Sequence, residues 1–447
     1  MKPILFFLFL LFSLSISAQP HAEPGGENLR DIYAPTHDGL SRQQEAVVIK
    51  MLKRNVAMLR RKGLLPRTNR TAATLFQWPL AQAPNFNDNG VYYISNYVDE
   101  DATAGILDYT CSNRTYDGHQ GTDIALWPFP WQKMALNAVQ IIAAAPGTII
   151  AKSDGLVDTS CGGCGACNWN AVYIMQADGS VSWYGHMKKN SLTPKTIGQT
   201  VALGEFLGYV GSSGASTSPH LHFQVWANNT YTTLIDPWAG ACNTLGGVTW
   251  WTNQQPYHVS TLNKIMTHHP LPVFSACKSG EAVNEKVNFV NGDTVYLASY
   301  YRDRDAGQQQ VNTIYRPDST VFSTWNYNFA SWASPDYKFF TRILPNPAPT
   351  GLWRYVAVYN GQPPLTIYFG VNELAYVFTG SGNWEVATNW SNNTIPPAVL
   401  PNGSEILIDP IPGGVCVLNH TETINAGAKM TVNPGKSFRI AGDLKLL

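Results

Sequence analysis

The sequence lacks an excess of charge of either sign, since 30 Lys and Arg residues balance 30 Asp and Glu residues. Nucleic-acid-binding proteins usually carry a basic excess, so we expect no nucleic acid partner. Charged residues are also scarce, at 13% of the chain. Because 44% of the residues are hydrophobic, the low charge does not indicate disorder. A length of 447 residues predicts roughly three domains.

Long apolar runs are also missing beyond the first residues. Residues 4–14 are apolar, follow Lys2 and precede small residues that end at Ala18. This run is shorter than the roughly 20 residues that cross a bilayer, and its pattern is typical of a secretory signal peptide. We therefore expect residues 1–18 to be removed. The mature chain is expected to be secreted or held in the cell envelope, with no transmembrane segment.

Several catalytic motifs are absent. The chain has no Gly-x-Ser-x-Gly elbow and no complete phosphate-binding loop, which argues against a serine hydrolase of that type and a P-loop nucleotidase. Ser275 and Lys278 match the spacing Ser-x-x-Lys, but the motifs that accompany it in β-lactamases are missing. We interpret that match as chance.

Seven cysteines are present, an odd number for an exported chain. The spacing of Cys161, Cys164 and Cys167 resembles an iron–sulfur motif, but Ala171 stands where the fourth cysteine is needed. In an oxidising compartment the three are better explained as disulfide partners that fix a loop. The expected partners are Cys111 or Cys242, and the isolated Cys416 is the predicted free thiol.

The composition favours a mainly β fold, because 53 aromatic residues (14 Trp, 21 Tyr and 18 Phe) accompany 37 Gly and 29 Pro. Residues 76–255 contain short strands, turns and glycine-rich loops, including a hairpin over 172–175 and 181–184. An immunoglobulin-like β-sandwich is predicted for residues 270–372. A small C-terminal β module, either a sandwich or a solenoid, is predicted for residues 376–447.

One helix is clearly predicted, over residues 41–62. Ser41 and Gln44 have the spacing of a capping box, and apolar residues recur along one face. The opposite face is basic. One possibility is that this face contacts a membrane or an anionic polymer. We favour two others: that the face is solvated, or that the helix belongs to a removable pro-segment over residues 19–75.

The strongest chemical signal is the alternating run of residues 219–226. On a strand, His220, His222, Gln224 and Trp226 share one face, and the two imidazoles lie about 7 Å apart. One ring of such a pair can bind a metal while the other reaches water on that metal. A His-x-His pair alone is weak evidence, because polar residues often alternate on strands.

Two other fragments add weight to this pair. One contains His119 and Asp123, and the other is the run Tyr184-Gly185-His186 at the end of the predicted hairpin. Each alone is better explained structurally. Together, two His and one Asp form a suitable ligand set for catalytic zinc with one open position, and two more His can move protons. Spacing alone leaves open which of His220 and His222 binds the metal.

These fragments, with the run from Gly208 to Phe223, resemble the M23 family of zinc endopeptidases of the lysostaphin and LytM type. The resemblance covers about residues 115–240. It implies an antiparallel β-sheet domain with an open groove that holds one zinc ion (Zn2+). It also implies His119, Asp123 and His222 as metal ligands, and His186 and His220 as the catalytic pair.

The function implied by this resemblance is zinc-dependent hydrolysis of peptide bonds in bacterial cell-wall peptidoglycan. One of the two catalytic imidazoles would take a proton from water and pass it to the leaving amine, while the other would stabilise the oxyanion. The alternative is a non-catalytic module that binds the cell wall or activates another enzyme. Aromatic residues of the C-terminal modules would, in a third reading, bind a cell-surface polysaccharide, although such residues usually form cores.

Overall fold

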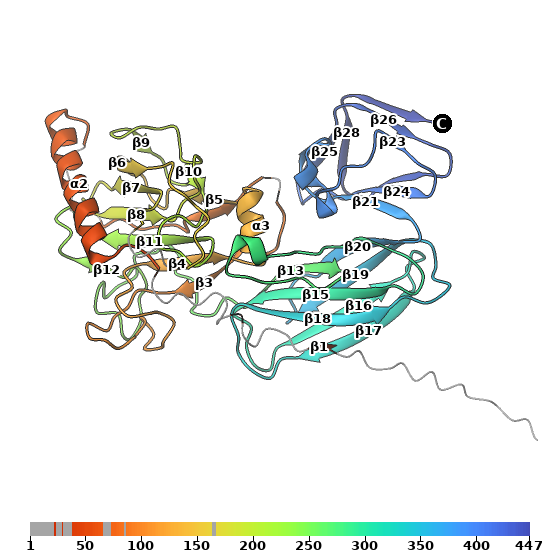
Figure 1. Cartoon of the computed structure of the whole chain (residues 1–447), viewed down its shortest axis with the longest axis horizontal. Helices are drawn as coiled ribbons and strands as arrows, with labels where there is room; N and C mark the ends of the chain where they lie inside the picture. Colours follow the sequence, from red (N-terminus) through yellow and green to blue (C-terminus); the bar gives the residue numbers. More distant parts are fainter. Residues whose placement is uncertain (1–21, 24–28, 30–37, 66–72, 85, 163–166) are drawn as a thin grey trace, which may run out of the picture.

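The computed structural model describes residues 22–23, 29, 38–65, 73–84, 86–162 and 167–447. The predicted signal peptide, residues 1–18, lies outside this set. The fold is mainly β, as predicted, and three β bodies follow one another along the chain (Figure 1). None of the helices in the described ranges is both long and apolar enough to cross a bilayer.

The first body is built on a sheet of eight antiparallel strands that carries the predicted site residues. Its strand order is β3 (Tyr92–Asn96), β4 (Thr122–Leu126), β11 (His220–Trp226), β8 (Val181–Gly185), β7 (Ala171–Met175), β6 (Gly147–Ser153) and β9 (Thr200–Val201), with β12 (Leu234–Ile235) paired to β11. The predicted hairpin corresponds to β7 and β8. A smaller sheet has the order β10 (Phe206–Tyr209), β5 (Val139–Ile142) and β2 (Leu80–Gln82). A buried aliphatic and aromatic core joins the two sheets.

The predicted N-terminal helix is α2 (Arg42–Arg61), and Ser41 forms the predicted capping box with Gln44. Its apolar face, which includes Leu52, Val56 and Leu59, packs against Trp169 and Tyr173 of the first body. Asn55 lies within this interface and donates to the backbone carbonyl of Ile150 at 2.9 Å. The helix therefore covers one side of the sheet (Figure 1), which leaves its basic face outside.

The second body is a sandwich of two sheets around one core. One sheet has the order β1 (Ala22–Glu23), β18 (Asp336–Ile343), β15 (Thr294–Arg302) and β13 (Thr261–His268); the other has β14 (Asn288–Phe289), β20 (Leu365–Val371), β19 (Gly351–Tyr359), β16 (Gln309–Tyr315) and β17 (Val321–Asn328). Strand β13 precedes residue 270, so the sandwich contains more chain than the predicted range. Its immunoglobulin-like character stays a prediction.

The third body is a solenoid with three parallel sheets. Their orders are β21 (Leu374–Phe378), β24 (Ser404–Ile408) and β27 (Lys429–Val432); β22 (Gly382–Asn383), β25 (Val415–Leu418) and β28 (Ser437–Ile440); and β23 (Val399–Leu400), β26 (Thr421–Ile424) and β29 (Asp443–Leu446). Successive strands enter the three sheets in turn, so the chain winds around a core that includes Trp384 and Trp390. Of the two predicted shapes, the solenoid is the one observed.

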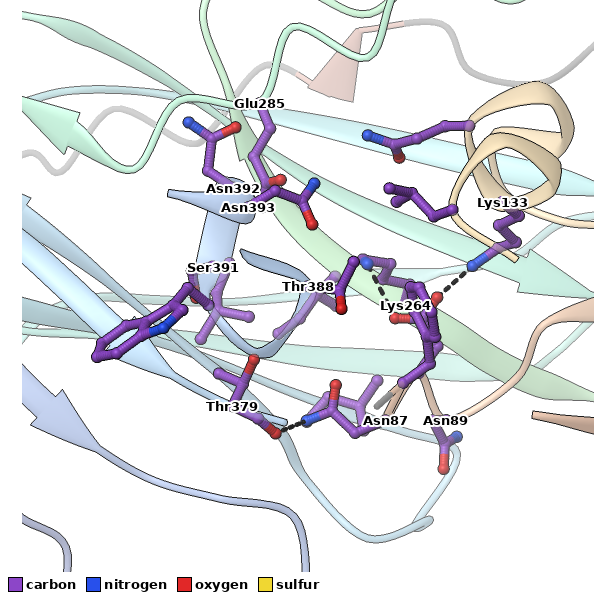
Figure 2. A pocket seen from close by; sticks show the side chains of 18 of the residues that line it. Asn87, Asn89, Lys133, Lys264, Glu285, Thr379, Thr388, Ser391, Asn392 and Asn393 are labelled. Carbon is purple, nitrogen blue, oxygen red and sulfur yellow. Dashed lines mark hydrogen bonds and ion pairs between the residues drawn. The ribbon is translucent and has the colours of Figure 1, made fainter. Parts of the chain in front are cut away.

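Short helices connect these elements. They are α3 (Pro130–Ala135), η1 (Lys278–Gly280), η2 (Ala387–Asn389) and η3 (Ser391–Asn393). Helix α3 follows β4 and contributes the buried Lys133, whose ammonium pairs with Asp88; Asp88 also binds Lys264 of the sandwich at 2.8 Å. Figure 2 shows Lys133 and Lys264 at a cavity of about 190 Å³, where Asn87 donates to the carbonyl of Thr379 in the solenoid at 2.8 Å. All three bodies therefore meet at this cavity.

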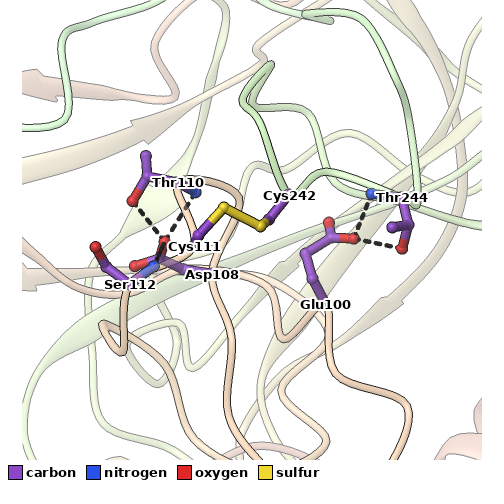
Figure 3. The surroundings of a disulfide bond; sticks show 7 residues. All are labelled: Glu100, Asp108, Thr110, Cys111, Ser112, Cys242 and Thr244. Carbon is purple, nitrogen blue, oxygen red and sulfur yellow. Dashed lines mark hydrogen bonds between the residues drawn. A yellow bond between two sulfur atoms is a disulfide. The ribbon is translucent and has the colours of Figure 1, made fainter.

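The disulfides differ from the prediction. Cys111 and Cys242 bind each other, close to the hydrogen bonds of Asp108 and Glu100 (Figure 3), and Cys161 binds Cys277 of the second body. The expectation that the 161–167 cluster pairs with Cys111 or Cys242 is therefore wrong, because folding brings those two cysteines to each other. Cys167 is also disulfide-bonded, and Cys164 lies outside the described residues. Cys416 is free and buried, as predicted.

Candidate metal centre

Three neighbouring strands place four of the five predicted site residues. His222 is the cross-strand partner of Asp123 on β4 and of Gly185 on β8. His220 and His222 share a face of β11, and His186 directly follows β8. His119 comes from the loop before β4. At Gly121 in that loop, a Cβ atom would lie 2.6 Å from His222 Nε2, so only glycine allows this approach.

The predicted ligands His119, Asp123 and His222 converge. Asp123 Oδ2 lies 3.0 Å from His119 Nε2, and Asp123 Oδ1 lies 2.8 Å from His222 Nδ1. One donor atom from each residue lies within 4.8 Å of the other two. Two imidazole nitrogens and one carboxylate oxygen form the donor set of catalytic zinc, which keeps a fourth position open.

The outer nitrogens of the two ligand rings support this fit. His119 Nδ1 lies 2.6 Å from the backbone carbonyl of Tyr97, and His222 Nε2 lies 3.2 Å from Gln224 Oε1. Each outer nitrogen that donates to its oxygen leaves the inner nitrogen with a free lone pair, as metal-binding histidines need. The three residues therefore fit a zinc ion.

His186 and His220 form a second pair beside this group. Their Nδ1 atoms lie 2.6 Å from the Ser213 carbonyl and 2.8 Å from the Ser218 carbonyl, respectively. The Nε2 atoms of both rings are buried without a hydrogen-bond partner, and the ring centroids are 4.3 Å apart. His220 Nε2 also lies 3.7 Å from Asp123 Oδ1. Buried polar atoms are normally paired, so these nitrogens are suited to a bound molecule.

Burial and charge together set the protonation of the group. Burial raises the pKa of Asp123, but His119 and His220 outweigh this and hold that pKa well below its usual range. Burial lowers the pKa of His119, but Asp123 raises it more. Burial, followed by repulsion from His220 and His222, lowers the pKa of His186 well below its usual value. Asp123 is thus ionised and His186 is neutral near pH 7.

The segment before and within α2 contributes residues that the sequence analysis missed. Asp38 Oδ2 accepts from Thr217 Oγ1 at 2.8 Å and lies 4.0 Å from His220 Nε2, while Asp38 Oδ1 is buried without a partner. Glu45 of α2 accepts from Gln224 Nε2 at 3.3 Å. No sequence motif marks Asp38 or Glu45, because their role depends on where the segment packs.

This segment changes the expected shape of the site. All five residues are buried, and the most exposed of them, His222, is 3% exposed. A cavity of about 130 Å³ remains, lined by residues that include Asp38, Glu45, Tyr116, His119 and His222. In this chain residues 38–45 cover the predicted groove.

Comparison with known proteins gives matches to this part of the chain. Residues 135–234 match the model of Peptidase family M23. Lysostaphin of Staphylococcus simulans is 37% identical over 70 residues, which are 15% of this chain and 14% of lysostaphin. Glycyl-glycine endopeptidase ALE-1 of Staphylococcus capitis is 37% identical over 70 residues, which are 15% of this chain and 18% of ALE-1. The chain thus spans less than a fifth of either relative.

Two solved structures are also similar to parts of the chain. The catalytic domain of the M23 protein EnpA from Enterococcus faecalis is 29% identical, with a TM-score of 0.20 and coverage of 32% of this chain and 85% of that one. A zinc-containing peptidase from Vibrio cholerae is 19% identical, with a TM-score of 0.20; the match covers 35% of this chain and 38% of that one. On the match of residues 135–234 and the sequence identity to lysostaphin and ALE-1, the chain carries a domain of peptidase family M23.

Proposed function

We propose that this protein is a secreted, zinc-dependent endopeptidase that hydrolyses peptide bonds of bacterial cell-wall peptidoglycan. The observation that carries the proposal is the convergence of His119, Asp123 and His222 beside two imidazoles with unpartnered Nε2 atoms. The match to a peptidase family and the similarity to lysostaphin and to a glycyl-glycine endopeptidase support the proposed reaction and substrate class.

In this proposal His119, Asp123 and His222 hold the zinc ion. When bound, zinc supplies Lewis-acid chemistry, polarising the scissile carbonyl and making water acidic enough to lose a proton near neutral pH. The remaining chemistry belongs to His186 and His220. Both rings donate through Nδ1 to backbone carbonyls, so both present Nε2 to the site.

His220 is the better candidate for the proton transfer. Its Nε2 lies 3.7 Å from Asp123 Oδ1, so the carboxylate stabilises the imidazolium that forms when His220 takes a proton from water. The same nitrogen would then protonate the leaving amine. His186 is held neutral by burial and by its two neighbouring rings and donates through Nδ1, so its Nε2 lone pair would accept a hydrogen bond from the attacking water and orient it.

We also propose that residues 19–75 form a removable pro-segment that keeps the enzyme latent. The support is the position of Asp38, whose backbone carbonyl accepts from the Tyr116 hydroxyl and whose neighbour Gly39 donates through its N–H to the Ala215 carbonyl at 2.9 Å. A peptide substrate must approach His220 where the Asp38 carboxylate lies. Cleavage within this segment would release the cover.

Digestion of purified peptidoglycan tests the proposed function. The chain nicked by a protease within residues 19–75 should release new amino termini from the wall faster than the intact chain, and a zinc chelator should stop the release. Zinc restoring the lost activity would support the metal's role. If the nicked chain bound one zinc ion per molecule but cleaved no wall, the proposed enzymatic activity would be contradicted. That result would favour a non-catalytic module that binds the wall or activates another enzyme.

A further inference from the structure

The outward face of helix α2 carries a row of cations. Lys50, Lys53, Arg54 and Arg61 are all exposed to solvent. Because an α-helix has 3.6 residues per turn and rises 1.5 Å per residue, these four positions fall within about 100° of its circumference and span about 17 Å of its length. We call them the basic stripe. The exposed residue in the middle of the stripe is the small Ala57, so no bulky side chain separates the cations.

The basic stripe has no counter-charge. Among the residues that the structure describes, no carboxylate oxygen lies within 4.0 Å of any of its four cations. The one acidic residue of α2, Glu45, is turned toward the sheet, where it accepts from Gln224 Nε2. Like charges four positions apart on a helix, such as Lys50 and Arg54, repel each other. A chain without net charge therefore concentrates unpaired positive charge on one surface.

The opposite face of α2 is occupied, which restricts the kind of partner. Leu52, Val56 and Leu59 are buried in a cluster with residues of the sheet, and the helix lies along the outside of the first body (Figure 1). An amphipathic helix binds a lipid surface by inserting its apolar face, and this face is not free to insert. Within α2 one large apolar residue, Val47, is exposed. A soluble polyanion is therefore a better partner than a membrane.

We infer that the basic stripe binds an anionic polymer of the cell wall whose backbone carries repeated phosphate groups. Guanidinium and ammonium groups form charge-assisted hydrogen bonds with phosphate oxygens, and each such contact releases a counterion from the polymer. A linear polymer can follow a straight row of cations. A nucleic acid strand has similar backbone charge, but proteins that hold single strands also stack the bases on aromatic side chains. The stripe and the central Ala57 offer no aromatic ring.

Only the choice of the cell wall as the source of the polymer rests on the proposed function; the charge of the partner does not. Helix α2 belongs to residues 19–75, the proposed removable segment. The polymer would therefore hold the latent, uncleaved chain at the wall, and cleavage of the segment would release the enzyme from the polymer.

Fluorescence anisotropy of labelled poly(glycerol phosphate), titrated with the intact chain, tests the inference. The affinity should fall about 50-fold between 50 mM and 200 mM salt, the loss expected if four cations each neutralise one phosphate of a flexible strand. The double variant Lys53→Gln/Arg54→Gln should bind about tenfold or more weakly at low salt and about halve the salt dependence. Both side chains are exposed, so the fold should tolerate the change.

Arg439→Gln/Lys445→Gln is the matched control. These two cations of the solenoid are also exposed, and no described carboxylate oxygen lies within 4.0 Å of either. The control removes the same charge and should leave both the affinity and its salt dependence unchanged. An equal loss of affinity in the two double variants would overturn the assignment to the basic stripe, and so would the absence of binding at low salt.

Two further probes test the class of partner at equal phosphate concentration. Tighter binding of a single-stranded oligonucleotide would assign the stripe to nucleic acid, and tighter binding of vesicles of anionic phospholipid would assign it to a membrane; either result would overturn the inference. These measurements need neither zinc nor turnover. Failure of the wall-digestion assay would therefore contradict the proposed enzyme and leave the charge of the partner established by the titration.

Discussion

Asp123 and His222 face each other across adjacent antiparallel strands, with 2.8 Å between Asp123 Oδ1 and His222 Nδ1. This contact follows from strand register, because directly opposed residues bring their Cβ atoms to about 5 Å. A slip of one residue would turn His222 to the opposite face of the sheet. The centre therefore depends on strand pairing more than on loop conformation.

Replacing His222 with Ala should abolish both zinc binding and peptide hydrolysis, since the group would lose one of its three ligands. Elemental analysis and a wall-digestion assay measure the two effects. His258→Ala is the control, because His258 pairs with Asp305 outside the centre and is partly exposed. A His222→Ala protein with full activity would rule out the proposed metal centre.

Replacing His220 with Ala should leave zinc content unchanged and lower kcat by about 10²- to 10⁴-fold, the usual effect of losing a general acid–base group. The reason is that His220 Nε2 points toward the group without being one of its three ligands. Loss of zinc from this variant, or unaltered turnover, would contradict the assigned role.

Asp38→Ala should increase the activity of the intact chain severalfold, because it removes the carboxylate beside His220 while α2 stays packed on the sheet. Initial rates of wall digestion, before any proteolytic cleavage, measure the effect. Asp318→Ala, at an exposed turn of the sandwich, is the control. Equal rates for the intact wild-type and Asp38→Ala chains would argue against latency by this contact.

The ion pairs of Asp88 should make the free energy of unfolding decrease at acid pH. Burial raises its pKa, but Lys133 and Lys264 outweigh this and lower it from 3.8 to about 2. Because the folded pKa is depressed, the stabilisation is complete above about pH 5 and is lost as the pH falls through 2, a difference of about 2 kcal/mol. Denaturant unfolding measures the free energy of unfolding of wild type and of Asp88→Asn. The difference between the two proteins should be smaller at pH 2 than at pH 5 by that amount. A constant difference would contradict the ion pairs.

The disulfide between Cys161 and Cys277 should stabilise the protein by about 2–4 kcal/mol, as expected for a bond that closes a loop of more than a hundred residues. The double variant Cys161→Ser/Cys277→Ser should show this loss in denaturant unfolding. Cys416→Ser, at the free thiol, removes no disulfide and serves as the comparison. Equal stability of the double variant and wild type would contradict the bond.

The sequence predicted the local features whose signals are local. The capping box at Ser41, the β7–β8 hairpin and the shared face of His220 and His222 each depend on a few neighbouring residues, and all three are observed. The gathering of His119, Asp123 and His222 required the family resemblance, because residues about a hundred positions apart carry no spacing signal.

Features that depend on packing were not predictable. The alternation of β11 predicted the shared face of His220 and His222 but not its burial; all seven residues of the strand are buried, because α2 and residue 38 cover that face. The cysteine pairing was mispredicted for the same reason, since Cys277 reaches Cys161 only once the sandwich packs on the first body.

One hydrophobic cluster contains Tyr93, Trp127 and Phe129 from the first body and Met266 and Tyr300 from the second. Its side chains leave water only when both bodies are present. A fragment cut at residue 255 would display those aromatic rings to solvent and should self-associate when expressed alone. Heating the whole chain should correspondingly melt the two bodies in a single calorimetric peak.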